Sequence, residues 1–184
     1  MAPSVRVREV MATTVATIGP EASLHDAARL LRAQHISGIP VVDAAGTVVG
    51  ILSEKDIVAQ LHRATGVGSA RGLLDLLLES SPNRGENVLE VSRHQLHNGR
   101  VAEAMHTPVV TVEEDAPLEK AAHLMREAGV KRLPVLDRHG RLVGIVTRSD
   151  VVAAVSGAPH GRRGGLSPGP TNGTGTPPGP FEDA

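Results

Sequence analysis

The chain contains one segment written twice. Residues 7–61 align with residues 101–155 over 55 positions without a gap, and 22 of those positions are identical. A repeat of this size is one supersecondary unit that cannot bury its apolar face alone, so we expect the two copies to pack on each other. Packing of equivalent surfaces creates related clefts between the copies, and these clefts are where we expect the function to lie.

Composition narrows the class of protein. The 184 residues carry a formal net charge of −1 and include no cysteine, which excludes disulfides, thiolate metal sites and cysteine nucleophiles. No basic stripe interleaves with aromatic residues, so we expect no nucleic-acid partner. The first residues lack the apolar core of a signal peptide, and no apolar run approaches the roughly 18 residues of a membrane span. We therefore expect a cytoplasmic protein that has no membrane partner.

Each copy has the pattern of an α+β unit. A short helical turn ends at Met11 or Met105 and is followed by a short strand, a helix, a two-stranded hairpin and a closing helix. The apolar residues of the first long helix recur at i, i+3, i+4 and i+7, which gives one buried stripe per copy. The predicted strands are residues 15–18, 39–42 and 47–52 in the first copy and 109–112, 133–136 and 142–146 in the second. The predicted stripes are Leu24, Ala27, Ala28 and Leu31, then Leu118, Ala121, Ala122 and Met125.

The remaining segments differ in character from the repeats. Residues 62–100 form a linker, in which residues 73–78 are predicted to be a short apolar helix. Residues 157–184 are rich in Gly, Pro, Ser and Thr, and such a segment cannot bury enough apolar surface to order itself. The expected organisation is therefore repeat, linker, repeat and disordered tail.

The sharpest local motif lies where each hairpin meets its closing helix. A Gly-apolar-apolar-(Ser/Thr)-x-x-Asp run occurs at residues 50–56 and again at residues 144–150. In one interpretation it is a helix N-terminus, because a hydroxyl with an acid three residues later resembles a capping box. In the other, the exposed N–H groups attract a phosphate and the acid accepts both hydroxyls of a ribose. Sequence alone leaves both interpretations open.

The ordered duplicate resembles a pair of CBS domains, the family named after cystathionine β-synthase, arranged as a Bateman module. The matching features are Val-x-x-x-Met, Pro-Val-x-Asp, Val-Gly-Ile and Ser/Thr-x-x-Asp, in this order in both copies. The resemblance implies two β-α-β-β-α repeats packed with pseudo-twofold symmetry. It also implies a non-catalytic regulatory module for an adenosine-containing ligand: AMP, ADP, ATP, S-adenosylmethionine or NAD(H).

The family resemblance also implies site residues. One cleft would use Thr147 and Asp150, with Ile145 against the base and Ala16 and Ile36 completing the pocket. The other would use the nucleotide-binding residues Ser53, Asp56, Ile51, Val110 and Val130. Some family members place phosphate-binding basic residues just before the Pro-Val strand, where this chain has Lys131 and Arg132. Lys55 and Arg148 could also reach a phosphate, although all four cations could equally be solvated.

Other functions have weaker support. His94 and His97 could share one helix face, but no carboxylate completes a recognisable metal-ligand set. The chain has no G-x-S-x-G motif and no P-loop, so we predict no enzyme and no catalytic cofactor. The alternative to a nucleotide sensor is an interaction scaffold without a physiological ligand. In either case we expect a homodimer, and a separate effector protein could receive the signal.

Overall fold

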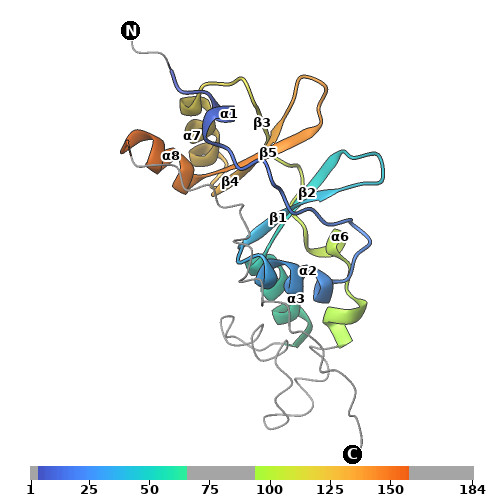
Figure 1. Cartoon of the computed structure of the whole chain (residues 1–184). Helices are drawn as coiled ribbons and strands as arrows, with labels where there is room; N and C mark the ends of the chain where they lie inside the picture. The colour runs from blue at the N-terminus through green and yellow to red at the C-terminus, as the bar shows by residue number, and fades with distance from the viewer. Residues whose placement is uncertain (1–3, 66–93, 158–184) are drawn as a thin grey trace, which may run out of the picture.

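The computed structural model describes residues 4–65 and 94–157, which form two similar lobes (Figure 1). One lobe holds α2, α3 and α6 with a two-stranded sheet, and the other holds α1, α7 and α8 with a three-stranded sheet. The predicted helix at residues 73–78 and the predicted tail beyond Gly157 lie outside the described residues. The two sheets meet in the middle of the molecule, with the helices on the outside.

The two repeats share the order of their helices and hairpins, and the second repeat has one additional short strand. The first consists of α1 (Val7–Val10), α2 (Leu24–Ala33), β1 (Gly38–Val42), β2 (Val48–Ser53) and α3 (Glu54–Thr65). The second consists of α6 (Val101–Ala104), β3 (Val112–Glu113), α7 (Leu118–Glu127), β4 (Arg132–Leu136), β5 (Leu142–Thr147) and α8 (Arg148–Val155). Residues 94–98, just before α6, are also helical. The order confirms the tandem mixed repeat predicted from the sequence.

The helix patterns predict burial well. Leu24, Ala27, Ala28 and Leu31 of α2 are all buried, as are Leu118, Ala121 and Met125 of α7. The exception is Ala122, which is half-buried. The Ser23 hydroxyl accepts a hydrogen bond from the backbone N–H of Asp26, so Ser23 caps α2. Pro117 stands at the N-cap of α7.

The hairpins also follow the prediction. β1 and β2 pair antiparallel, with Gly38 opposite Ser53, and β4 and β5 pair in the same way, with Arg132 opposite Thr147. The turns end at Gly46 and Gly140, whose φ angles are 84° and 75°. Glycine adopts these left-handed angles without the steric cost that a Cβ would add.

The predicted first strand of each copy is shorter than expected. Residues 15–18 make only an isolated parallel bridge, from Ile18 to Val41, and β3 contains only Val112 and Glu113. The reason is a change of lobe within each segment. Ala12 is hydrogen-bonded to Ile145 of the second repeat, whereas Ile18 is paired within its own repeat. The intervening residues cross between the lobes and cannot run along a single strand.

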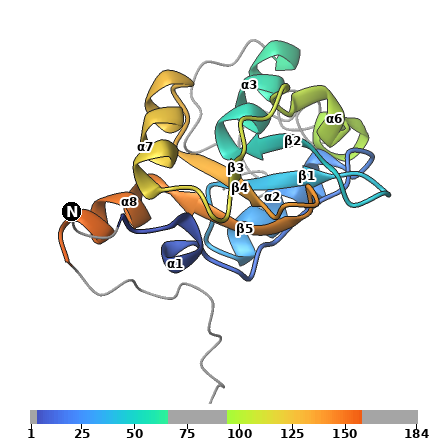
Figure 2. The ribbon, with the colours of Figure 1, turned by 90° about the horizontal axis from the view of Figure 1, so that it is seen from above.

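The opening helix of each repeat packs in the lobe of the other repeat. Val7 and Val10 of α1 belong to the apolar core that contains Leu118 and Leu133. Val101 and Ala104 of α6 belong to the core built on α2, β1 and β2. Figure 2 shows α1 beside α8, and α6 on the same side of the molecule as α3 and β2. The two cores are therefore built jointly, which explains why neither copy can bury its apolar face alone.

Candidate functional site

The start of α8 joins Thr147 and Asp150 in a closed pair. Oδ2 of Asp150 accepts hydrogen bonds from the backbone N–H of Thr147 at 2.7 Å and from its hydroxyl at 2.6 Å. The backbone N–H of Asp150 donates in return to the Thr147 hydroxyl at 3.4 Å. This reciprocal arrangement is a capping box, so the capping interpretation holds in the ligand-free chain.

The start of α3 has the same two hydrogen bonds to its carboxylate and adds a partner from the second repeat. Oδ2 of Asp56 accepts from the backbone N–H of Ser53 at 2.7 Å and from its hydroxyl at 2.6 Å. Oδ1 of the same carboxylate lies 2.8 Å from Nε2 of His106, which follows α6. One oxygen of Asp56 therefore caps the helix, while the other contacts the opposite repeat.

Each Ser/Thr–Asp pair lies next to a crossing segment of the other repeat. The backbone of Ala12 exchanges two hydrogen bonds with Ile145, at 2.9 and 3.0 Å. The backbone of His106 exchanges two with Ile51, at 2.9 and 3.2 Å. Because Ile145 and Ile51 lie two residues before Thr147 and Ser53, each predicted site is assembled from both repeats. We refer to them as the Asp150 site and the Asp56 site.

The predicted base-contacting residues share one property. None is fully buried: each is half-buried and retains exposed apolar surface. Ala16 and Ile36 pack against the core of the first repeat, and Val110 and Val130 pack against the core of the second. Exposed apolar surface of this kind is what a ligand base could cover. The set is Ile145, Ala16 and Ile36 for the Asp150 site, and Ile51, Val110 and Val130 for the Asp56 site.

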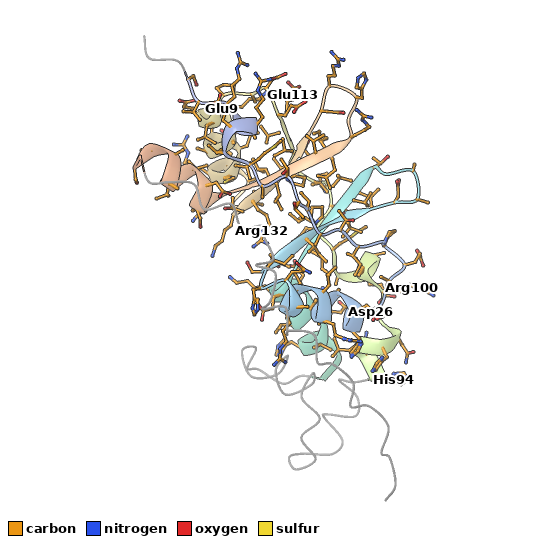
Figure 3. The ribbon with its side chains drawn as sticks, viewed as in Figure 1. Glu9, Asp26, His94, Arg100, Glu113 and Arg132 are labelled. Atoms are coloured by element: carbon orange, nitrogen blue, oxygen red, sulfur yellow. The ribbon has the colours of Figure 1, made fainter. Side chains whose placement is uncertain are left out.

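Arg132 connects the repeats directly. Its Nη1 donates to the carbonyl oxygen of Gly38 at 2.8 Å, and its Nη2 donates to the Ser37 hydroxyl at 2.6 Å. Figure 3 shows this side chain at the boundary between the two lobes. Burial lowers the pKa of Arg132, and the nearby Asp56 carboxylate acts in the opposite direction. The guanidinium thus holds the two hairpins together in the ligand-free protein.

The other three predicted phosphate contacts are exposed. Lys131 lies beside the Asp150 site, because its carbonyl oxygen accepts from the backbone N–H of Arg148 at 2.9 Å. Arg148 occupies the first turn of α8, and Lys55 occupies the first turn of α3. Two of these exposed cations therefore lie at the Asp150 site and one at the Asp56 site.

Two histidines of the first lobe form a ring stack. His25 of α2 and His97 have ring centroids 4.2 Å apart and an interplanar angle of 27°. His94, on the same short helix as His97, is exposed. Within residues 4–65 and 94–157, no three His, Asp or Glu side chains come together as a metal-binding group. The stack connects the end of the linker to α2.

His106 is the site residue that sequence reasoning missed. We assigned it no role from the sequence, whereas the structure places it against Asp56. The alignment of the repeats gave one indication. His106 aligns with Ala12, whereas the Met before it and the Thr after it are identical in the two copies. Sequence alone could not say which carboxylate the imidazole would meet, because the two residues belong to different repeats.

Comparison with known proteins agrees with this architecture. The family profile of the CBS domain matches residues 7–63 and 101–157. A CBS domain-containing protein of Dictyostelium discoideum is 36% identical over 150 residues, covering 80% of this chain and 89% of that protein. The protein CBSX1 of Arabidopsis thaliana, which is named as chloroplastic, is 33% identical over 138 residues, covering 74% of this chain and 57% of its own length.

Two solved structures with bound ligands are also similar. The CBS domain pair of protein MJ0100 in complex with 5'-methylthioadenosine and S-adenosyl-L-methionine has a TM-score of 0.62 and 25% identity. The match covers 84% of this chain and 98% of the MJ0100 chain. CBSX2 of Arabidopsis thaliana in complex with AMP has a TM-score of 0.58 and 28% identity, covering 83% of this chain and 96% of that chain. In the described part of our chain, no helix combines the length and apolar character needed to cross a membrane.

Proposed function

This chain belongs to the CBS domain family, and we propose that it is a regulatory module that binds an adenosine-containing ligand at the Asp150 and Asp56 sites. The observation that carries the proposal is the duplicated Ser/Thr–Asp pair, placed each time beside a crossing segment of the other repeat. The ligands named for the two similar structures, AMP and S-adenosyl-L-methionine, support an adenosine ligand. We propose that the module acts without catalysing a reaction and that it resides in the cytoplasm.

The proposed chemistry assigns a part to each group. The Asp150 or Asp56 carboxylate would accept the two ribose hydroxyls, and the Thr147 or Ser53 hydroxyl would donate to a phosphate oxygen. The base would cover the half-buried aliphatic residues, because the described residues include no Phe, Tyr or Trp on which it could stack. AMP, ADP, ATP, S-adenosylmethionine and NAD(H) all carry the adenosine group that these contacts recognise.

Regulation would follow from differential affinity. Each proposed site contains residues of both repeats, so a ligand bound there favours one relative orientation of the repeats over others. A separate effector protein or a second copy of the chain would detect that orientation. We propose a homodimer, and the exposed Val152 and Val155 of α8 support it, with 59% and 83% of their surface accessible. Sedimentation that shows only monomer at tens of micromolar would contradict the dimer and also the scaffold alternative.

The decisive experiment separates capping from ligand binding. Calorimetry would screen AMP, ADP, ATP, S-adenosylmethionine and NAD(H) against the parent chain and against Asp150→Asn and Asp56→Asn. Loss of the charged acceptor should weaken adenosine binding about 10-fold or more, because one charge-assisted hydrogen bond contributes roughly 1.5–3 kcal/mol. Asn preserves the shape of the side chain, so the melting temperature should change little.

Asp26→Asn is the matched control. Asp26 also forms a capping pair, since its Oδ2 accepts from the Ser23 hydroxyl at 2.8 Å, but it lies at the start of α2, away from the proposed sites. It should leave adenosine affinity unchanged. If all three variants lose stability equally and bind as tightly as the parent, the two acids are only caps. Binding of none of the five ligands by the parent would favour the interaction scaffold instead.

The phosphate contacts need a separate test. We propose that Lys131 and Arg148 contact phosphate at the Asp150 site, with Lys55 in this role at the Asp56 site. Lys131→Ala should then weaken ATP more than adenosine, because charge-assisted contacts to phosphate are lost. Arg132 is a less specific probe, since its side chain already joins the repeats. Equal weakening of adenosine and ATP by Lys131→Ala would show that Lys131 supports the fold rather than the ligand.

A further inference from the structure

Position 106 is one place where the two proposed sites differ in chemistry. His106 and Ala12 are equivalent in the duplication. The backbone of each exchanges two hydrogen bonds with an isoleucine of the other repeat. The side chains differ, because alanine has only a methyl group and histidine has two ring nitrogens that can hydrogen-bond. Any functional difference between the sites that originates here must come from the imidazole.

The imidazole completes the set of partners of Asp56. Nε2 of His106 lies 2.8 Å from Oδ1, while Ser53 donates twice to Oδ2, so both carboxylate oxygens are engaged before a ligand arrives. Only 11% of the Asp56 side chain is exposed, against 75% of the His106 side chain. In the described residues the Asp150 carboxylate is bonded only through its Oδ2, to Thr147, and the residue equivalent to His106 is Ala12, which pairs with Ile145 and has no side-chain donor.

We infer that His106 is a specificity-determining residue that makes the two sites unequal, so that the Asp150 site binds an adenosine ligand more tightly than the Asp56 site. The inference rests on the proposed function, because it assumes that the two acids receive the ribose. A ribose that reaches Asp56 must displace the imidazole from Oδ1. A ribose that reaches Asp150 meets no such competitor.

The exposure of His106 sets the size of this effect. A polar contact with one largely exposed partner contributes little, because solvent competes for it and holding the side chain costs conformational entropy. The imidazole can therefore turn into solvent when a ribose arrives, and the Asp56 site can still bind a ligand. We expect a difference of about twofold to fivefold in affinity, the range measured for contacts between exposed polar side chains. The two sites would then fill in order as the ligand concentration rises.

The duplication supplies a reciprocal test. In an Asp150→Asn background calorimetry reports mainly AMP binding at the Asp56 site, where His106→Ala should tighten AMP about twofold to fivefold. In an Asp56→Asn background it reports mainly AMP binding at the Asp150 site, where Ala12→His should weaken AMP by a similar factor. His94→Ala, an exposed histidine in the first lobe, is the control and should change neither affinity.

The outcomes are distinct. Tighter binding with His106→Ala and weaker binding with Ala12→His support the inference. Weaker binding with His106→Ala would overturn it, because the imidazole would then contact the ligand rather than compete with it, and unchanged binding would overturn it as well. A parent chain that binds no AMP, ADP, ATP, S-adenosylmethionine or NAD(H) would remove the proposed function itself.

A second measurement tests the contact without any ligand. The free energy of unfolding is compared for His106→Ala, Asp56→Asn and the double variant. Residues in direct contact give losses that do not add. Non-additive losses support the pairing of His106 with Asp56, whereas additive losses would overturn the inference whatever the ligand.

Discussion

The guanidinium of Arg132 occupies the space that a side chain at residue 38 would fill, and residue 38 is glycine. A Cβ at Gly38 would lie 2.6 Å from Nη1 of Arg132 and 3.0 Å from the carbonyl oxygen of Leu52. The two residues are equivalent in the duplication, and each begins the first hairpin strand of its repeat. The repeats therefore meet at this position with one long side chain from one copy and space for it in the other.

Gly38→Ala should destabilise the protein by about 1–3 kcal/mol, the usual effect of excess volume in a packed region. The added methyl group meets both a guanidinium and a backbone oxygen, and the oxygen cannot move aside without disturbing the hairpin. Urea unfolding followed by circular dichroism measures the loss. Gly19→Ala is the control, because a Cβ there meets nothing within 4 Å. Equal losses for the two variants would mean that the Arg132 contact is unimportant.

The second prediction concerns the methionine that ends each opening helix. A Cβ at Gly144 would lie 2.4 Å from Sδ of Met11 and 3.0 Å from the carbonyl oxygen of Ala12, and a Cβ at Gly50 would lie 2.3 Å from Sδ of Met105. Methionine is flexible and can move, but the backbone oxygen cannot. Gly144→Ala should therefore destabilise more than Gly50→Ala, within the range of about 1–3 kcal/mol.

Shortening the methionine separates this cause from a general effect of alanine. Gly144→Ala should lower the free energy of unfolding less in the Met11→Ala protein than in the parent protein. The measurement is again the free energy of unfolding in urea. If the loss from Gly144→Ala is the same with Met11 present or absent, the contact between the repeats does not explain the glycine.

The third prediction is a loss of stability in mild acid. Burial lowers the pKa of His25, and the neighbouring His97 ring lowers it further, while Asp26 acts in the opposite direction. The folded chain therefore binds fewer protons at this site than the unfolded chain below about pH 6.5. The stability is fully present above that pH and is lost as the pH falls through the folded pKa.

Thermal melts between pH 8 and pH 5 measure this dependence. His25→Gln should flatten the melting temperature across the interval, because the titrating group is removed. His94→Gln, which changes an exposed histidine, should retain the slope. A slope that is the same in His25→Gln and in the parent would assign the dependence to other groups.

The fourth prediction concerns the turn of the second hairpin. Hydrogen bonds from the backbone N–H of Arg141, then from its side chain and from the N–H of His139, lower the pKa of Asp137 to about 2, although burial acts in the opposite direction. The stability that this carboxylate contributes is present above its unfolded pKa near 3.8 and is lost as the pH falls towards 2. Asp137→Asn should therefore lower the melting temperature at pH 7 and weaken its decline between pH 4 and pH 2.

Asp43 provides the matched comparison. It occupies the same place in the first hairpin, where its Oδ1 accepts from the N–H groups of Ala45 and Thr47, both at 2.9 Å. Among the described residues Asp43 has no arginine partner, whereas the Arg141 side chain bonds Asp137 at 2.7 Å. Asp43→Asn should accordingly cost less stability than Asp137→Asn. A larger loss for Asp43→Asn would show that the ion pair contributes nothing to the turn.

Much of the fold could be predicted because its signals are local. The apolar stripes of α2 and α7, the glycines at the two hairpin turns and the capping pairs at Ser53 and Thr147 all depend on residues close in sequence. The duplication added the one long-range statement that sequence could make, that two like units must pack together. The first strands were overpredicted, because a β-type pattern at residues 15–18 does not reveal that the chain is crossing between lobes.

The sequence by itself determined which two helices begin with a Ser/Thr–Asp pair and which repeat contains each helix, because both facts follow from spacing along the chain. Only the tertiary structure decided what each of these starts meets from the other copy. It placed His106 against Asp56 and the equivalent Ala12 beside Ile145, and it directed Arg132 towards Gly38. These contacts join residues far apart in sequence, and which of them form depends on how the opening segments are exchanged between two packed cores. No pattern within one repeat contains that information, because the exchange is stabilised by the burial of one repeat's side chains in the other.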